Sequence, residues 1–370
     1  MAYTDIDKPS DYFNTKLYTG NGTDDHAITG VGFQPDWVWV KERSTGQDHN
    51  LFDSVRGAGS TKGLISNNTS AEGIDSVQYG YISSFDSDGF TLADGSDGSF
   101  PNARMNDNGA EYVSWNWLAG GTASSNTDGS ITSSVSANTT AGFSIVSWTG
   151  TGADATVGHG LSSAPTIYIV KNRSDASDWR VGQVLTSSNN MTNGNGYYME
   201  LNDTKASTNP GSATTWGATP TAPTSSVFTV GSNNAHNGSG DNMIAYCFHS
   251  VKGYSKFGSY TGNGNSDGTF VYTGFKTSFV IAKCSSNDGE VWNLWDNKRD
   301  GMNGDNSRLF PNNSNAESED SSPNEMDLLS NGFKFRHTNS ANNGSGRTYI
   351  YMAFASNPFV TSTGIPTTAR

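Results

Sequence analysis

The chain has 370 residues, of which 11% are aromatic and only 15% are charged, against about a quarter in average domains. Its polarity comes instead from Ser, Thr, Asn and Gly, a composition typical of short strands joined by many turns, so a helical protein is excluded. The formal net charge of −13 repels phosphate backbones and excludes nucleic acid as a partner.

Composition shifts and internal similarity divide the chain into six segments. The two terminal arms carry too few apolar residues to fold alone. A long Gly/Ser/Thr-rich stretch between the first two repeats resembles a linker, with room for one strand, and we expect this junction to bend more readily than the short one between the second and third repeats. In chain order we expect an N-terminal arm (1–12), a first repeat (13–118), a linker (119–142), a second repeat (143–249), a third repeat (250–359) and a C-terminal arm (360–370).

The repeats rest on three stretches that align without a gap, at residues 17–44, 147–174 and 259–286. Each begins with an aromatic residue, Thr and Gly, and each places a lysine at the same position. Two further blocks recur in the same order, N-[ND]-[TS]-x-A and a closing apolar run. Copies of roughly 100 residues match the size of a self-sufficient two-sheet sandwich. The sequence therefore predicts an all-β protein of three tandem, jelly-roll-like β-sandwich modules.

Within each copy, the most apolar segments predict the central and closing strands. WVWVK, IYIVK and FVIAK are apolar on both faces, as expected of a central strand. Trp37 and Trp39 align with Ile167 and Ile169 in the second copy, so these positions stay apolar while changing shape. This behaviour indicates core residues rather than sugar-stacking platforms. Phe279 and Ile281 fill the same positions in the third copy, and we expect all of them to be buried.

Catalytic motifs are missing from the sequence, which contains no GxSxG, HExxH, GxxxxGK[ST] or CxxC. The six histidines occupy unrelated positions in the three copies, whereas a duplicated active site would leave matching ones. We therefore expect no enzyme and no cofactor. Stretches 86–89, 94–98 and 106–109 resemble fragments of calcium loops but also ordinary turns, so the sequence leaves a metal site undecided.

Aromatic residues outside the aligned blocks are the candidate ligand contacts. Trp216 lies in a Pro/Thr/Gly-rich insertion of the second copy, and Tyr79 and Tyr81 lie in the corresponding stretch of the first. Such residues either contact a partner or glycan or dock on their own domain. The two cysteines, Cys247 and Cys284, sit at positions that the other copies do not repeat, so we expect free thiols.

Several motifs together resemble a repeat-containing protein family of tailed phages of marine bacteria: YTGNG (18–22), GFQPDWVWVK (32–41), HNLFDSVRG (49–57), SFDSDGFTL (84–92), SWNWLAGG (114–121) and the ending NPFVTSTGIPTTAR (357–370). The resemblance covers essentially the whole chain. It implies a virion structural protein, namely a tail fibre or receptor-binding component that contacts the host surface. A capsid decoration or head-fibre protein and a glycan depolymerase are the alternatives.

The same resemblance implies other virion proteins as partners, and a host-surface glycan or protein as a possible receptor. We expect a homo-oligomer, a trimer, because linked copies of a weak binder gain avidity. No apolar run reaches the about 18 residues of a membrane span, and the first residues lack the features of a secretory signal. We therefore expect a virion protein made in the host cytoplasm and released by lysis, without membrane insertion.

Overall fold

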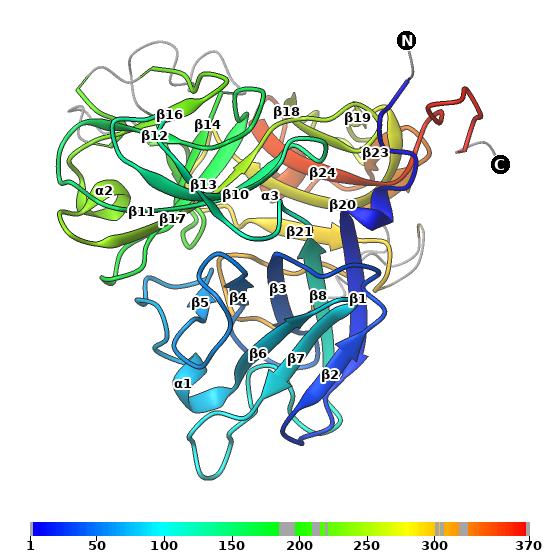
Figure 1. The fold of residues 1–370 in the computed structure, drawn as a ribbon. Coiled ribbons are helices and arrows are strands. Elements are labelled where there is room, and N and C mark those ends of the chain that lie inside the picture. Colours follow the sequence, from blue (N-terminus) through cyan, green and yellow to red (C-terminus); the bar gives the residue numbers. More distant parts are fainter. Residues whose placement is uncertain are drawn as a thin grey trace.

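The structure is a computed structural model that describes residues 3–184, 197–208, 215–218, 221–299, 303, 307–317 and 325–367. Among the residues that the structure describes, strands take up 41% and helices 5%, so the expected all-β fold class is confirmed. We call residues 13–118, 119–249 and 250–359 units 1, 2 and 3. Figure 1 shows them as three lobes, with unit 1 below and units 2 and 3 side by side above it.

Unit 1 consists of a large sheet and a small sheet. The large sheet has the order β1 (Phe13–Thr19), β8 (Glu111–Trp117), β3 (Trp37–Glu42), β4 (Asn50–Asp53), β5 (Leu64–Ile65). The small sheet has the order β2 (His26–Thr29), β7 (Gly89–Ala93), β6 (Tyr81–Asp86). The short helices η1 (Pro9–Asp11) and α1 (Ser76–Tyr79) precede the first strand and β6.

Units 2 and 3 repeat this sheet order. The large sheet of unit 2 runs β15 (Met199–Glu200), β14 (Arg180–Gln183), β13 (Ile167–Asn172), β17 (Asn242–Phe248), β11 (Phe143–Thr149), β10 (Ser133–Asn138), β9 (Ser124–Asn126), and its small sheet pairs β12 (Ala155–Gly158) with β16 (Val227–Val230). In unit 3 the sheets are β18 (Ser255–Thr261), β24 (Thr348–Pro358), β20 (Phe275–Cys284), β21 (Asn293–Asp296) and β19 (Phe270–Tyr272), β23 (Gly332–Phe335), β22 (Met326–Leu329). Helices α2 (Asn234–Asn237) and α3 (Ser340–Asn343) precede the closing strands.

Strand register places the three aligned lysines at equivalent positions. Each lies near the end of the central strand and opposite the same position of the closing strand. The pairs are Lys41 with Val113, Lys171 with Ile244, and Lys283 with Ile350.

The prediction of a linker at 119–142 is corrected by the structure, because this stretch forms two strands of unit 2. β10 pairs antiparallel with β11, and β9 pairs with β10. Buried and exposed side chains alternate here as in a strand with one face against the core: Ser133 and Val135 are buried, Ser134 between them is exposed, and Ser136 is buried again. The segment extends the sheet, so it does not serve as the readily bending junction that its composition predicts.

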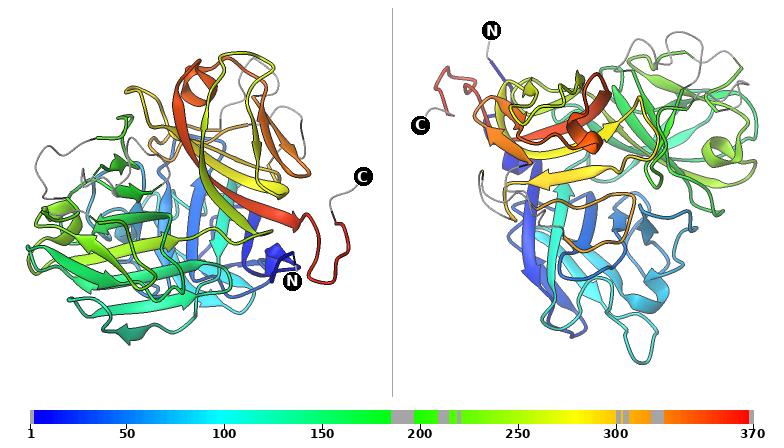
Figure 2. Two further views of the ribbon diagram at one scale, coloured as in Figure 1. Left: turned by 90° about the horizontal axis from the view of Figure 1, so that it is seen from above. Right: turned by 180° about the vertical axis from the view of Figure 1, so that it is seen from behind.

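A single apolar core joins the outer faces of the three large sheets. The cluster contains Trp37, Trp115 and Trp117 of unit 1 together with Tyr246 of unit 2 and Phe354 of unit 3. Smaller cores fill the space between the two sheets of each unit. Figure 2 shows the three units from two further directions. The central strands are apolar on both faces because one face packs inside its own unit and the other lies in the shared core. The expectation of self-sufficient sandwiches is therefore wrong.

The described parts of the two terminal arms lie together on unit 3. Tyr3 donates to the carbonyl of Gly274, and its ring centroid is 6.3 Å from that of Phe359. Asp7 accepts hydrogen bonds from the backbone and side chain of Ser362, each 2.6 Å long. Both chain ends accordingly appear on the unit 3 side of the molecule (Figure 1).

Candidate functional site

Equivalent backbone hydrogen bonds link the units in a closed cycle. In each bond, an amide after the N-[ND]-[TS]-x-A block of one unit donates to a carbonyl after the central strand of the next. The three bonds are Glu72 to Arg173 (2.9 Å), Ser207 to Ser285 (3.0 Å) and Glu317 to Arg43 (2.8 Å). Unit 1 thus contacts unit 2, unit 2 contacts unit 3, and unit 3 contacts unit 1, as in an approximately threefold arrangement.

The aligned lysines reinforce two of these junctions. The Lys171 ammonium donates to the carbonyl of Thr69 in unit 1 at 3.0 Å and to Ser177 in its own unit at 2.5 Å. Lys283 bonds Thr204 of unit 2 in the same manner, at 3.0 Å. Burial lowers the pKa of Lys41, Lys171 and Lys283 to about 8. Their amino groups bind backbone oxygens, so these lysines hold loops together.

Buried ion pairs complete the junctions of unit 1 with units 2 and 3. Asp53 pairs with Arg56 and accepts from the Tyr246 hydroxyl of unit 2 at 2.7 Å. The equivalent Asp296 pairs with Arg299 at 2.8 Å and accepts from the Trp115 indole of unit 1 at 3.0 Å. In unit 2 the same strand position is Gln183, which faces Ile167 as Asp53 faces Trp37. The recurring charged residues therefore serve the junctions between units.

A buried asparagine explains the recurring Thr-Gly-x-Gly motif. In unit 2, Asn237 accepts from the amide of Thr151 and donates to the Thr151 hydroxyl and the Ala153 carbonyl. Gly152 in this loop has φ of 66°, a conformation that L side chains rarely adopt. Asn106 and Asn343 hold the loops of units 1 and 3 in the same way. The motif thus has a structural role, because its loop is fixed by hydrogen bonds to the buried asparagine.

Of the two alternatives for Trp216, the structure shows docking on its own unit rather than an outward contact. Its side chain is completely buried and packs against Tyr168 and His236, with ring centroids 5.0 and 4.5 Å away. The indole donates to the carbonyl of Tyr197 at 3.1 Å, which satisfies its polar atom. The ring fills the space between the two sheets of unit 2, where burial of a large aromatic surface is favourable.

Tyr79 and Tyr81 are both half-buried in unit 1. Tyr81 packs against the core between the two sheets, whereas the Arg104 guanidinium lies 5.2 Å from the centroid of the Tyr79 ring. Two exposed apolar side chains that the sequence analysis did not single out lie in the same region, Ile74 (57% exposed) and Phe100 (66%). Both lie in polar loops outside the aligned blocks. A large apolar residue in such a loop is the same signal that made Tyr79 a candidate.

We call Ile74, Tyr79, Phe100 and Arg104 the unit 1 tip. The loop at 94–104 folds back on α1, since Ser96 and Asp97 donate to Val77 and Gln78 and Arg104 donates to Tyr79. In Figure 1 this loop, drawn in cyan, protrudes from the lower end of unit 1, away from the chain ends. The tip thus presents apolar and cationic groups together at one extremity of the molecule.

The calcium-like stretches act as turns in the structure. Asp88 accepts from the amides of Gly30 and Gly32 at 3.0 and 2.6 Å, and Asp97 accepts from those of Ser99 and Phe100. Among the residues that the structure describes, no three His, Cys, Asp or Glu side chains gather where they could hold a metal ion.

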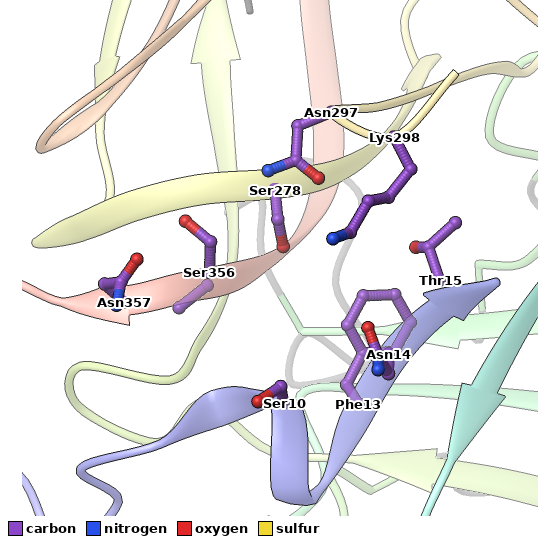
Figure 3. Close-up of a pocket in the computed structure, with 10 residues that line it drawn as sticks. Ser10, Phe13, Asn14, Thr15, Ser278, Asn297, Lys298, Ser356 and Asn357 are labelled. Atoms are coloured by element: carbon purple, nitrogen blue, oxygen red, sulfur yellow. The ribbon is translucent and has the colours of Figure 1, made fainter. Parts of the chain in front are cut away.

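A polar pocket of about 260 Å³ lies between units 1 and 3 (Figure 3). Figure 3 shows Lys298 extending into it toward Ser278. Thr15 lines the pocket with a buried hydroxyl that has no protein partner, while its counterparts Ile145 and Phe257 are apolar. The other lining residues are Ser10, Phe13, Asn14, Asn297, Ala355, Ser356 and Asn357. Lys298 is the only ionisable side chain among the lining residues that the structure describes, and the other polar groups offer hydrogen bonds.

These features define an all-β protein in which three related units share one core and use their repeated polar residues to hold one another. Residues 8–358 match a family model described as a domain of unknown function, DUF7483, and the chain belongs to this family. No curated protein matches the sequence. Within the described ranges, no helix is long and apolar enough to cross a membrane.

Proposed function

We propose that the protein is a non-enzymatic structural component of a phage particle that contacts the host surface, as a tail fibre or receptor-binding component. The observation that carries the proposal is that the repeated polar residues bind neighbouring units rather than form a site open to a substrate. Lys171, Lys283, Asp53, Asp296 and their partners bind at the junctions between units. The repeated polar residues therefore hold the units to one another, and we place the receptor contact in the loops.

The unit 1 tip is the surface best suited to a receptor. Aromatic and arginine side chains dominate binding energy at protein interfaces, and here Phe100 is 66% exposed beside Tyr79 and Arg104. Arg104 is held by Asp75 and Asp48, each at 3.3 Å, so its guanidinium is already positioned. A preorganised side chain loses less entropy on binding.

Capsid decoration without receptor binding is the second candidate, favoured by the closed cycle of contacts. One chain supplies by itself an approximately threefold body, which suits a threefold position on a shell. The homotrimer remains a prediction. Such a trimer would contain three copies of this three-unit body.

Two measurements test the proposal. An antibody raised against the protein should label intact particles purified from a host lysate. Fluorescently labelled protein should bind host cells, and the double variant Tyr79→Ala/Phe100→Ala should bind at least about tenfold more weakly. Gln78→Ala, an exposed neighbour on α1, is the matched control and should bind like the unaltered protein.

Unlabelled particles would contradict the whole proposal. Labelled particles together with unchanged binding by the double variant would exclude the unit 1 tip as the receptor contact. Labelled particles with no binding of any form to host cells would favour the decoration role.

A further inference from the structure

In each unit, the opening strand of the large sheet and the first strand of the small sheet run past one another on one side. We call this the open side. In unit 1, the Asn14 side chain on β1 donates to the carbonyl of Val31 after β2, at 2.9 Å. In unit 3, the equivalent Lys256 on β18 donates to the carbonyl of Tyr272 on β19, at 2.7 Å. The two sheet edges therefore lie within reach of one side chain.

In unit 2 the chain itself covers the open side. β10 pairs with β11 at the edge of the large sheet, over Ser134 to Asn138. Just before it, Ile131 forms a parallel bridge to Val157 of β12, and its amide donates to the carbonyl of Thr156 at 3.0 Å. Residues 124–138 thus add to one sheet and touch the edge of the other. Unit 2 shows how an extended segment fits this side of the fold.

In unit 3 the same side has no such cover from any described residue. β18 and β19 are edge strands of their sheets. Phe270 is 44% and Tyr272 52% exposed, while Val271 between them points inward. By strand register, which shifts units 2 and 3 by one residue from the gapless alignment here, their counterparts are Ala27 and Thr29 in unit 1, and Thr156 and Gly158 in unit 2. Only unit 3 carries large aromatic residues there, and exposed apolar groups on an edge strand are costly unless something covers them.

The terminal arms extend this apolar surface. Phe359 is 39% exposed, and Tyr3 connects it to the end of β19 through its contacts with Phe359 and Gly274. Of the six exposed large apolar side chains found in the described residues, three lie in this region: Phe270, Tyr272 and Phe359. With Tyr3, we call them the unit 3 apolar patch.

Positive charge flanks the patch in a chain whose net charge is −13. The Lys252 ammonium lies 4.4 Å from the centroid of the Tyr3 ring, and Lys256 lies 5.3 Å from that of Tyr272. Within the part of the chain that the structure describes, neither lysine forms a salt bridge. These two ammonium groups have no carboxylate partner among the described residues and lie beside an apolar edge. They therefore complement a partner that carries carboxylates.

We propose that the open side of unit 3 binds an extended, acidic segment of another protein, which adds as a strand beside β18 and covers Phe270 and Tyr272. Addition of a strand satisfies the edge backbone groups, and the aromatic side chains supply specificity. A second copy of this chain fits less well, because a symmetric contact would bring Lys252 and Lys256 against their own counterparts. The inference holds whether or not the protein belongs to a phage particle.

Two synthetic strand peptides test this proposal. Both carry an alternating Thr-Val-Thr-Val-Thr core, and they differ only in flanking Glu or Lys residues. Their binding to the full chain is measured by fluorescence anisotropy. We expect the Glu-flanked peptide to bind at least about tenfold more tightly than the Lys-flanked one, with saturation below about 1 mM.

Substitutions then locate the binding surface. Phe270→Ser/Tyr272→Ser should weaken binding of the Glu-flanked peptide by about tenfold, and Lys252→Glu/Lys256→Glu should reverse the preference between the peptides. Phe100→Ser, which removes an even more exposed aromatic residue from unit 1, is the control and should change neither affinity. Circular dichroism of each variant verifies that the fold is intact.

Three outcomes would overturn the proposal. These are no binding of either peptide at about 1 mM, equal binding of both, or binding that the substitutions in the patch do not change. Sedimentation of the full chain gives an independent measurement. Concentration-dependent dimers that Phe270→Ser/Tyr272→Ser abolishes would assign the patch to a second copy instead.

Discussion

Trp37 of unit 1 stacks on Tyr246 of unit 2, with ring centroids 4.3 Å apart and ring planes inclined by 18°. The hydroxyl of the same tyrosine donates to Asp53, which lies opposite Trp37 on the neighbouring strand. One side chain of unit 2 thus contacts both the apolar and the polar part of the junction. The stability of each unit therefore depends on its neighbours.

Truncation of this stack should destabilise the whole molecule. We expect Trp37→Ala to lower the free energy of unfolding by about 3–5 kcal/mol, through lost burial and the cavity left behind. Because the core is shared, calorimetry should show one transition moving to lower temperature rather than unit 1 unfolding separately. Phe100→Ala, at the exposed tip, should stay within about 0.5 kcal/mol of the unaltered protein.

Removal of a buried carboxylate should be equally costly. Asp296→Ala leaves the fully buried Arg299 guanidinium without its nearest partner, and we expect a loss of about 3–5 kcal/mol in denaturant unfolding. Lys8→Ala breaks the exposed pair with Asp11 and should cost less than about 1 kcal/mol. Equal effects of the two substitutions would mean that the junction does not depend on its ion pair.

Acid should weaken the fold before most carboxylates titrate. Burial lowers the pKa of His49 and His236 well below the usual 6.5. Below pH 6.5 the unfolded chain takes up protons that the folded chain does not, so the free energy of unfolding falls as pH falls. Each of these histidines contributes a slope of up to about 1.4 kcal/mol per pH unit.

Replacement of one histidine tests that origin. Thermal unfolding of His236→Leu, measured between pH 7 and 5, should show a smaller loss of stability than the unaltered protein. An unchanged pH dependence would assign the acid sensitivity to other groups.

Cys247 and Cys284 are free and buried, as the sequence predicts. Burial also raises the pKa of the Cys247 thiol, so little reactive thiolate forms near neutral pH. A thiol reagent such as dithionitrobenzoate should react with neither cysteine in the folded protein and with both after denaturation. Rapid reaction of a thiol in the native state would show that one of these strands opens readily.

The repeat alone predicted the central strands and the burial of Trp37 and Trp39, because aligned positions that stay apolar are core positions. It could not predict which residues face a neighbouring unit. Glu72 and Arg173 meet across 101 positions, and nothing local in the sequence marks that ion pair. Ser133 to Asn138 resembled a linker because its small polar residues hide a weak alternation, which pairing with β11 makes into a strand.

The candidate site was harder to predict than the fold. Burial of Trp216 depends on the path of the insertion back between the sheets, which local composition does not specify. Ile74 and Phe100 could have been found by the rule that selected Tyr79, since both are large apolar residues in polar loops. The open side of unit 3 required comparison of pairing partners among the three units.

The position shared by Asp53, Gln183 and Asp296 has a consequence for how such a chain evolves. In an assembly of three identical subunits, every substitution at a junction occurs three times, so a loss of about 1 kcal/mol becomes about 3. Covalent fusion removes this multiplication. At one junction this position is an amide, whereas at the other two it is a carboxylate in a buried ion pair. Fusion thus gives each junction and each outer surface its own freedom to diverge.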